Sequence, residues 1–376
     1  MDREAVFTLA LAIQANIPVC LYGVPGVGKT SIIRQMAASL GWSVVEVNPS
    51  FITDPSDLTG IPVPSGEVTL YHPPMWVYDL ICGRYNVLLI DEINTAPRHV
   101  QPILLSMLLD CRIGLGGAEF PRHVRRVAAM NPPEYSAGGS ALNPALASRM
   151  LHIRWEADAK AFTRYMQGDP LEIPTLPDGW DKDIGETYEK IVAFLHVRPE
   201  LLCDEKQAKS GTGWPNPRTW RDYGARALHA ARKLVGLSDD LRAEVEYLAL
   251  GGCVGVGAAQ EYLTWEREAN LPNPYELLQN PSLWQPNEQR PDIAYAVANS
   301  VAYAADELAT QEAYLAAWRV LERIARHEAG ENELGLLATH ALDAAQRLER
   351  MRFAKGFSVA PQVALYRELL AAAGAL

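Results

Sequence analysis

The sequence predicts an α/β fold with a parallel sheet, followed by a helical lid and an all-helical C-terminal region. Three observations carry this prediction. A glycine-rich phosphate-binding motif lies between an apolar strand and a helix, strands and amphipathic helices alternate over about the first 155 residues, and strand signals fade after Trp155. Alternation of this kind is typical of a parallel sheet covered on both faces. We therefore expect domains at residues 1–156, 157–236 and 237–376.

The strands of the sheet are expected in five short apolar segments. These are Val19–Tyr22, Val44–Val47, Val87–Ile90, Val124–Met130 and Leu151–Trp155. A helix after the third segment carries one apolar face, which is expected to pack on the sheet, and Pro102 places its start nearby. That face consists of Val100, Ile103, Leu104, Met107 and Leu108.

Two segments interrupt the alternation. Ile61–Pro74 has a Ser65-Gly66 turn between extended stretches and is interpreted as a small hairpin inserted before the third strand. Cys111–Pro121 is a second candidate hairpin, with Gly114, Gly116 and Gly117 at its turn. Each is equally consistent with an ordinary surface loop.

Helices are expected to dominate after Trp155. Two apolar stripes predict helices in the lid: Ile184, Tyr188, Ile191, Val192 and Leu195, and then Trp220, Tyr223, Ala227, Ala230 and Leu234. Five prolines between Leu271 and Pro291 predict an irregular connection, and residues 292–376 are alanine-rich and expected to be helical.

Composition restricts the classes of function. The formal charge of -11 argues against a protein that coats nucleic acid or an anionic membrane, so protein partners are expected. The sequence shows no leader at its start and no apolar run long enough to insert in a bilayer. Five scattered cysteines predict reduced thiols, and together these features favour a cytoplasmic protein.

The phosphate-binding motif matches G-x-x-x-x-G-K-S/T in full. It consists of Gly23, Val24, Pro25, Gly26, Val27, Gly28, Lys29 and Thr30, and Ser31 follows as a further binding residue. The glycines let backbone N–H groups close around phosphates at a helix N-terminus. Lys29 is expected to reach the β- and γ-oxygens, and the Thr30 hydroxyl to ligate Mg²⁺.

An acidic pair follows the third expected strand. Asp91 and Glu92 emerge where four apolar residues end, at the edge where ligands of open α/β sheets bind. Asp91 is expected to hold the Mg²⁺ shell and Glu92 to accept a proton from the attacking water. The alternative is that both residues are only first-turn acids of the next helix.

These motifs and their order resemble the AAA+ ATPases, and within them the MoxR-like group of the dynein-related subfamily. The resemblance rests on Asp91-Glu92-Ile93-Asn94 after one strand and Asn131-Pro132 after a later one. It is strong over about residues 15–155, moderate through the lid and weak beyond. It implies a five-stranded core in the order 5-1-4-3-2.

The resemblance also implies roles for three further residues. Asn131 would be the first sensor, a neutral amide that holds the water or the γ-phosphate, unless it only caps the turn before Pro132. Arg149, at the end of the segment 142–149, would point at the nucleotide of the next subunit, unless it is only a surface arginine that closes a helix. Arg218, after Asn216 as N-cap, would be the second sensor and reach back to the γ-phosphate. Arg221 could substitute for it, and a solvated charge is the alternative.

The function that follows is a ring ATPase, expected to be a hexamer, which uses ATP and Mg²⁺ to remodel or activate a protein partner. MoxR-like proteins commonly work with a separate protein that carries a von Willebrand factor A domain. A chelatase motor, a McrB-like nucleic-acid enzyme and a nucleotide-gated scaffold are the alternatives. The acidic charge and the Met130-Asn131-Pro132 sequence argue against the McrB-like alternative.

Overall fold

The computed structural model describes residues 3–113, 118–135, 141–329 and 333–373. By their internal contacts these form two compact units. The first comprises Met1–Asp181 and Leu202–Gln260, and the second Lys182–Leu201 and Glu261–Leu376. The functional domain boundaries at 156 and 236 stay a prediction.

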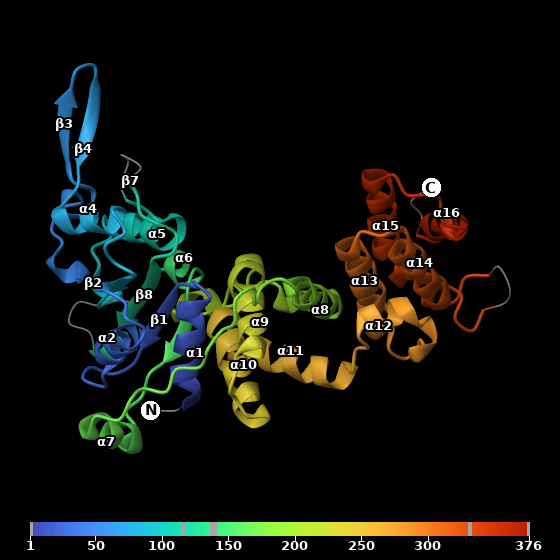
Figure 1. Ribbon diagram of the computed structural model, residues 1–376, viewed down its shortest axis with the longest axis horizontal. Coiled ribbons are helices and arrows are strands. Elements are labelled where there is room, and N and C mark those ends of the chain that lie inside the picture. The colour runs from blue at the N-terminus through green and yellow to red at the C-terminus, as the bar shows by residue number, and fades with distance from the viewer. Residues whose placement is uncertain (1–2, 114–117, 136–140, 330–332, 374–376) are drawn as a thin grey trace. The chain divides into compact units, whose positions relative to one another are not determined.

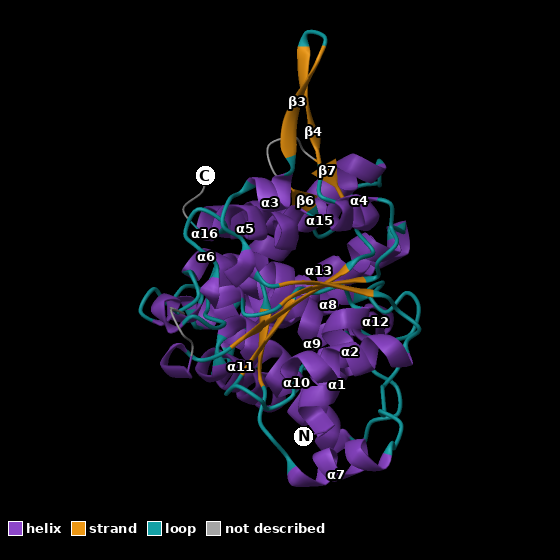
Figure 2. Cartoon of the chain, turned by 90° about the vertical axis from the view of Figure 1, so that its left-hand side faces the viewer, coloured by secondary structure: helices purple, strands orange, loops and turns teal. Residues whose placement is uncertain are grey.

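A five-stranded parallel sheet forms the centre of the first unit (Figures 1 and 2). Its strands are β1 (Val19–Tyr22), β2 (Val44–Val47), β5 (Val87–Ile90), β8 (Arg125–Met130) and β9 (Leu151–Arg154). The order β2-β5-β8-β1-β9 is the expected 5-1-4-3-2 order, and all four neighbouring pairs are parallel. All four residues of the middle strand β5 are buried, which is why an uninterrupted apolar run predicted it.

Helices and short turns connect and cover these strands. The helices of the first unit are α1 (Arg3–Gln14), α2 (Lys29–Ser39), α3 (Ser56–Thr59), α4 (Met75–Ile81), α5 (Gln101–Asp110), α6 (Pro144–Ala147), α7 (Ala159–Gln167), α9 (Ala225–Lys233) and α10 (Asp239–Val254). α5 begins one residue before Pro102, and Val100, Leu104, Met107 and Leu108 are fully buried, as the sequence predicted. α11 (Val256–Ala269) runs across the boundary between the two units.

The first candidate hairpin is confirmed. β3 (Ile61–Ser65) and β4 (Val68–His72) pair antiparallel and project from the first unit (Figures 1 and 2). Every residue of the two strands except Val63 is exposed. The second candidate is present as a short antiparallel pair, β6 (Arg112–Ile113) with β7 (Ala118–Glu119), and its glycine turn lies outside the described residues.

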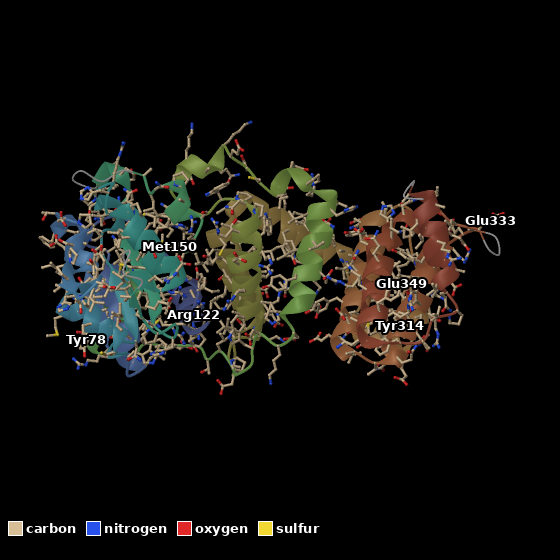
Figure 3. The ribbon with its side chains drawn as sticks, turned by 90° about the horizontal axis from the view of Figure 1, so that it is seen from above. Tyr78, Arg122, Met150, Tyr314, Glu333 and Glu349 are labelled. Atoms are coloured by element: carbon tan, nitrogen blue, oxygen red, sulfur yellow. The ribbon has the colours of Figure 1, made fainter. Side chains whose placement is uncertain are left out.

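The second unit is helical. It comprises α8 (Ile184–Val197), α12 (Pro274–Gln279), α13 (Pro291–Leu308), α14 (Gln311–Ala325), α15 (Leu342–Lys355) and α16 (Val363–Ala372). In its core the Tyr314 hydroxyl donates to Glu349 Oε1 at 3.0 Å, and Arg352 neutralises that carboxylate at 2.8 Å (Figure 3). No helix in the described part of the chain combines the length and apolarity needed to cross a membrane.

Two expectations about the second unit need correction. The expected stripe is only part of the buried face of α8, since Ile191 is 4% exposed but Val192 is 47% exposed. The helix also packs through Gly185, which leaves room for the Tyr303 ring, and through Glu189, which pairs with Arg347. The proline-rich connection also contains a helix, α12, because Asn273 caps it and Pro274 fits its first position.

Candidate nucleotide-binding site

The candidate site lies at the carboxyl edge of the sheet, where β1, β5 and β8 end. Because neighbouring strands are parallel and in register, the segments that follow them converge at this edge. The loop after β1 needs its glycines. Gly26 and Gly28 have φ angles of 82° and 89°, in the left-handed region that glycine tolerates. A Cβ on Gly23 would lie 2.1 Å from the Trp155 carbonyl oxygen.

Lys29 is held inside this loop. Its Nζ donates to the carbonyl oxygens of Gly23 at 2.8 Å and Val24 at 3.1 Å, and to Asn131 Oδ1 at 2.8 Å. The side chain is only 7% exposed, and burial lowers the pKa of the ammonium, while the nearby Asp91 carboxylate opposes that shift. A phosphate would replace neutral carbonyl partners by a charged one, so the position favours an anionic ligand.

Thr30 and Asp91 provide oxygen ligands that fit a magnesium ion. The Thr30 hydroxyl donates to Asp91 Oδ2 at 3.0 Å, and Asp91 Oδ1 accepts from the Glu92 backbone N–H at 3.0 Å. Burial raises the pKa of the Asp91 carboxyl group, an unfavourable effect that a bound cation would reverse. Mg²⁺ typically takes one or two protein oxygens together with substrate phosphates and water, which matches this pair.

Asn131 connects the phosphate loop to the acidic pair. Its Oδ1 accepts from Lys29, while its Nδ2 donates to Glu92 Oε1 at 3.4 Å. The Asn94 amide donates to the Asn131 carbonyl oxygen at 2.9 Å and orients the turn after β8. Glu92 has a φ of 55°, which is uncommon for a residue with a side chain and is associated with functional sites. The structure thus brings together Lys29, Thr30, Asp91, Glu92 and Asn131.

Arg149 and Arg218 lie elsewhere in the first unit, at the amino edge of the sheet. Arg149 precedes β9 by two residues, and its Nη1 donates to the Ala145 carbonyl oxygen at 2.5 Å. Burial and then repulsion by Arg218 lower the pKa of the Arg149 guanidinium, so the two arginines are electrostatic neighbours. No hydrogen bond or ion pair links either arginine to the Lys29–Asn131–Glu92 cluster within the described ranges.

The helix that carries Arg218 begins as predicted. Asn216 Oδ1 accepts from the Thr219 backbone N–H at 3.1 Å, and Thr219 Oγ1 accepts from the Asn216 N–H at 3.0 Å. The helical run continues through a π-helical segment, Thr219–Gly224, into α9. Arg218 lines a surface depression with Asn216, Pro217, Arg221 and Asp222, and not the cavities beside the phosphate loop. The segment 136–140, whose Ser-Ala-Gly-Gly-Ser sequence predicts a loop near the subunit boundary, lies outside the described residues.

Two cavities adjoin the phosphate loop. One, of about 610 Å³, is lined by Gly23, Asn131 and the segment 210–212, among others. The second, of about 420 Å³, lies between the start of α2 and α7 and is lined by Gly28, Ser31, Gln35, Phe162 and Tyr165, among others. Sequence reasoning missed Gln35, Phe162 and Tyr165. The available signal was the amphipathic pattern of α7, which has no buried residue.

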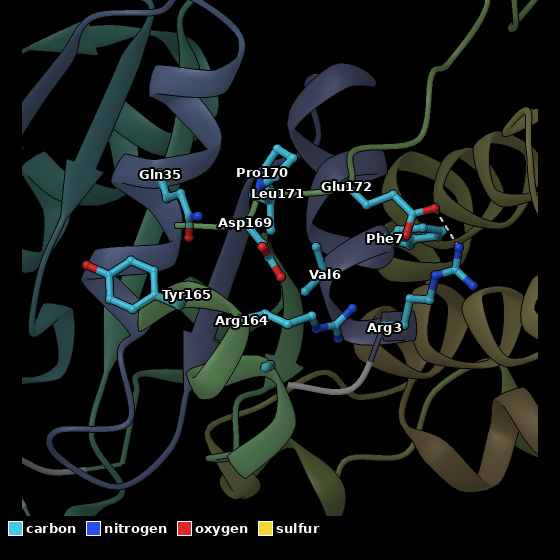
Figure 4. Close-up of a pocket in the computed structure, with 11 residues that line it drawn as sticks. Arg3, Val6, Phe7, Gln35, Arg164, Tyr165, Asp169, Pro170, Leu171 and Glu172 are labelled. Atoms are coloured by element: carbon cyan, nitrogen blue, oxygen red, sulfur yellow. Dashed lines mark hydrogen bonds and ion pairs between the residues drawn. The ribbon is translucent and has the colours of Figure 1, made fainter. Parts of the chain in front are cut away.

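A third cavity, of about 300 Å³, borders the second one through Gln35 and Tyr165 (Figure 4). In it the Arg3 guanidinium pairs with Glu172 and lies 5.3 Å from the centre of the Phe7 ring. Arg3 is therefore held by an acid and an aromatic ring, and Arg164 also lines this cavity.

Comparisons with known proteins agree with the geometry. The family model described as AAA domain (dynein-related subfamily) matches residues 18–150. Midasin of Dictyostelium discoideum is 28% identical over 209 residues, 52% of this chain and 3% of midasin. Chaperone MoxR1 of Mycobacterium tuberculosis is 34% identical over 107 residues, 27% of this chain and 26% of MoxR1. YeaC of Bacillus subtilis is 32% identical over 139 residues, 35% of this chain and 40% of YeaC.

A solved structure of a protein from Cytophaga hutchinsonii has a TM-score of 0.45 and 17% sequence identity, and the match covers 70% of this chain and 88% of that one. The present chain spans less than half the length of each of the three curated relatives above.

The phosphate loop, acidic pair and asparagine at the edge of a 5-1-4-3-2 sheet define a P-loop nucleotide-binding domain of the AAA+ class. Within that class, residues 18–150 match the AAA domain of the dynein-related subfamily, and the chain is similar to chaperone MoxR1 over 107 residues.

Proposed function

We propose that this protein hydrolyses ATP to ADP and phosphate with Mg²⁺, at a site completed by a neighbouring copy, and uses the energy to remodel a protein partner. One observation carries the proposal: Asn131 touches both Lys29 and Glu92, while Thr30 touches Asp91. This arrangement places a phosphate-binding cation, two metal-binding oxygens and a carboxylate base around one edge of the sheet.

Each residue has a distinct role in the proposal. Lys29 and the backbone of residues 23–31 bind the phosphates, and Thr30 and Asp91 hold Mg²⁺, which neutralises phosphate charge when it is bound. Glu92 takes the proton of the attacking water, and Asn131 orients that water against the γ-phosphate. The water oxygen forms the new bond to phosphorus, and the bond to the ADP oxygen breaks.

Arg149 and Arg218 are proposed to act together on the nucleotide of the next copy. Repulsion by Arg218 lowers the pKa of Arg149, which supports this role because a bound anion would replace repulsion by attraction. The sequence predicted that Arg218 contacts the γ-phosphate of the nucleotide bound to its own copy. In this proposal Arg218 instead contacts the nucleotide bound to a neighbouring copy. It requires a ring or a comparable assembly, and a cytoplasmic hexamer is the form we propose.

The nucleoside is proposed to occupy the cavity between α2 and α7. This cavity is continuous with the phosphate loop through Gly26 and Gly28, and Phe162 and Tyr165 are 62% and 51% exposed. Aromatic rings beside an apolar space suit a flat base, and the Gln35 amide offers both a donor and an acceptor.

A protein partner is supported by the β3–β4 hairpin. Ile61, Val68 and Leu70 are 64%, 60% and 49% exposed, which is unusual for apolar side chains of one element. Pro62 and Pro64 lack the N–H groups that would face outward from β3, so only β4 presents backbone donors to an added strand. A partner with a von Willebrand factor A domain remains the family-based proposal for the protein bound.

The hydrolytic role is tested with Glu92→Gln and Lys29→Ala. Glu92→Gln is expected to keep ATP affinity and to lower turnover by about 10²–10⁴-fold, because a positioned general base contributes that much. Lys29→Ala is expected to weaken ATP binding itself. Calorimetry and phosphate release measure the two effects. Equal loss of binding and turnover in Glu92→Gln would contradict the role of Glu92.

The partner-binding role is tested by replacing Leu70 and Val68 with Ser. Partner capture by the ATP-bound Glu92→Gln protein should fall while ATPase activity stays within about twofold, because exposed residues of the hairpin do not line the cavities beside the phosphate loop. A matched control is Leu308→Ser, which removes an apolar side chain that is 48% exposed on α13. Undiminished capture in the hairpin variant would exclude this surface.

A further inference from the structure

A polar cavity of about 270 Å³ opens at the amino edge of the sheet, separate from the cavities beside the phosphate loop. Three arginines line it: Arg122 before β8, Arg126 near the start of β8, and Arg226 on α9. Asn16 and Tyr223 also line this space, which we call the arginine cavity. Arg126 and Asn131 are five residues apart on one extended strand, so they are separated by roughly 16 Å.

The guanidinium of Arg126 has only neutral acceptors. Its Nη1 donates to the Leu108 carbonyl oxygen at 2.8 Å, and its Nη2 to the Asn16 carbonyl oxygen at 3.2 Å and to Asn16 Oδ1 at 3.1 Å. Its Nε is buried and has no hydrogen-bond partner among the residues that the structure describes. These bonds fix the orientation of the group but leave its positive charge uncompensated.

Arg226 and Arg122 add charge to the same space. Arg226 Nη2 donates to the Ala15 carbonyl oxygen at 3.1 Å, and its guanidinium lies 5.8 Å from the Trp180 ring centre. Arg122 is exposed, and no side-chain partner of it is found in the described part of the chain. Three positive charges therefore converge without a carboxylate bound to any of them.

One acid lines the cavity, but it is already engaged. Asp222 Oδ1 lies 3.3 Å from Arg221 Nη1, on the exposed side of the helical run. Burial lowers the pKa of Arg126, Cys111 and Tyr223 oppose this shift, and repulsion from Arg226 and Arg122 adds to it. In a chain of net charge -11, such a cluster is a local exception.

We propose that the arginine cavity binds a small phosphate-type oxyanion, as a second anion site distinct from the phosphate loop. The planar forks of arginine match the oxygens of phosphate, and an anion with two or more charges would replace repulsion by attraction. The volume is several times the roughly 30 Å³ that one water occupies in the liquid, so phosphate or pyrophosphate fits. The Tyr223 hydroxyl provides a further donor to such an oxyanion.

An anion in this cavity would connect two parts of the proposed catalytic machinery. Arg126 belongs to β8, which ends directly before Asn131, whereas Tyr223 and Arg226 belong to the helical run that begins beside Arg218. A bound oxyanion would hold this run against the start of β8. Its concentration would then influence how firmly Arg218 is positioned, which makes the cavity a regulatory site.

Direct binding of inorganic pyrophosphate tests the proposal. The full-length Lys29→Ala protein is titrated by calorimetry, because this change weakens the phosphate loop as a competing site. We expect binding that falls at least tenfold in Arg122→Gln and in Arg226→Gln, and that is weaker for inorganic phosphate, which carries less charge. The exposed side chain of Arg122 has no hydrogen bond or ion pair among the described residues, and the bond that its carbonyl oxygen accepts from Asn16 does not involve the side chain, so Arg122→Gln separates binding from unfolding.

Arg350→Gln is the matched control, since it removes an exposed arginine from the second unit. It should leave pyrophosphate affinity within twofold. Absence of pyrophosphate binding in the Lys29→Ala protein, or affinity that stays within twofold in both Arg122→Gln and Arg226→Gln, would overturn the proposal. Neither result depends on ATP hydrolysis, so the proposed function and this site fail separately.

Discussion

The two edges of the central sheet differ in how their charges are balanced. At the carboxyl edge, Lys29 has three oxygen partners, and Asp91 lies close enough to oppose the fall in its pKa. At the amino edge, Arg149 and Arg126 donate only to neutral oxygens and are repelled by other arginines. The carboxyl edge thus offers partners for a phosphate and for a metal, whereas at the amino edge no carboxylate binds Arg149 or Arg126 among the described residues.

This difference supports the proposal that one domain supplies two halves of a site shared between copies. At the carboxyl edge, Lys29 and Asp91 partly compensate each other's charge before phosphate and Mg²⁺ bind. An edge with excess positive charge gains most when another molecule brings negative charge to it. A neighbouring copy's nucleotide at Arg149 and Arg218, and a free oxyanion in the arginine cavity, would each provide that charge.

The largest expected effect comes from Arg149→Ala. Loss of an arginine that stabilises the phosphoryl-transfer transition state is expected to lower kcat by about 10³-fold or more, with little change in ATP affinity. Phosphate release measures the first quantity and calorimetry the second. Arg149→Lys should recover little, because a lysine lacks the planar fork.

Mixing Arg149→Ala with Glu92→Gln tests whether the two edges meet between copies. At some interfaces of the mixed assembly, Glu92 of the Arg149→Ala copy then lies opposite Arg149 of the Glu92→Gln copy. Part of the activity should therefore return. A mixed assembly that is demonstrated by tagged co-purification and yet stays inactive would show that Arg149 does not act across copies.

A smaller effect is expected from pH, through His152 at the start of β9. Its Nε2 lies 2.9 Å from the Ala147 carbonyl oxygen, and its Nδ1 is buried without a partner among the described residues. Burial lowers its pKa from 6.5 to about 4, so the folded protein resists protonation that the unfolded chain accepts. Stability is therefore fully present above about pH 6.5 and falls as pH decreases toward 4.

At about 1.4 kcal/mol per pKa unit, this shift corresponds to a loss of about 3 kcal/mol in the free energy of unfolding. Urea unfolding at pH 7 and pH 4.5 measures it. His152→Gln keeps a donor for Ala147 and should remove much of the pH dependence, whereas His99→Gln, at an exposed site, should not. Equal pH dependence in the protein and in His152→Gln would refute this account.

The smallest expected effects come from two glycines. A Cβ on Gly252 of α10 would lie 2.4 Å from the His152 carbonyl oxygen, so Gly252→Ala should reduce the free energy of unfolding by about 1–3 kcal/mol. Gly257 of α11 has open space around it, and Gly257→Ala should raise stability by about 0.5–1 kcal/mol. Urea unfolding compares them, and a neutral Gly252→Ala would mean that α10 can move away from β9.

The carboxyl edge was predictable residue by residue, because its parts are local in sequence. The phosphate loop, the Asp91-Glu92 pair and Asn131 each follow an apolar strand, and parallel pairing brings strand ends together. To predict that Asn131 contacts both Lys29 and Glu92, only the order of the strands was needed in addition to the motifs. The apolar stripe of α8, by contrast, predicted the buried face of this helix only in part, because Gly185 and the Glu189–Arg347 pair also determine its packing.

The amino edge could not be predicted in the same way. Arg126 and Arg226 are 100 residues apart in the sequence, and neither belongs to a motif. α7 shows a similar limit: Phe162 and Tyr165 form an amphipathic pattern that predicts burial, yet both stay exposed beside the phosphate loop. Hydrophobic periodicity describes one element, whereas exposure depends on what other elements leave uncovered.

The sequence by itself determined the strands, the functional segments that follow them and the chemistry of the carboxyl edge. Short-range patterns are enough for this, because they specify strand, turn and helix. Only the tertiary structure decided that Arg149 lies with Arg218, that three arginines surround one cavity and that a hairpin projects with exposed apolar side chains. Such groupings depend on long-range packing, in which residues far apart in the chain become neighbours without any local signal.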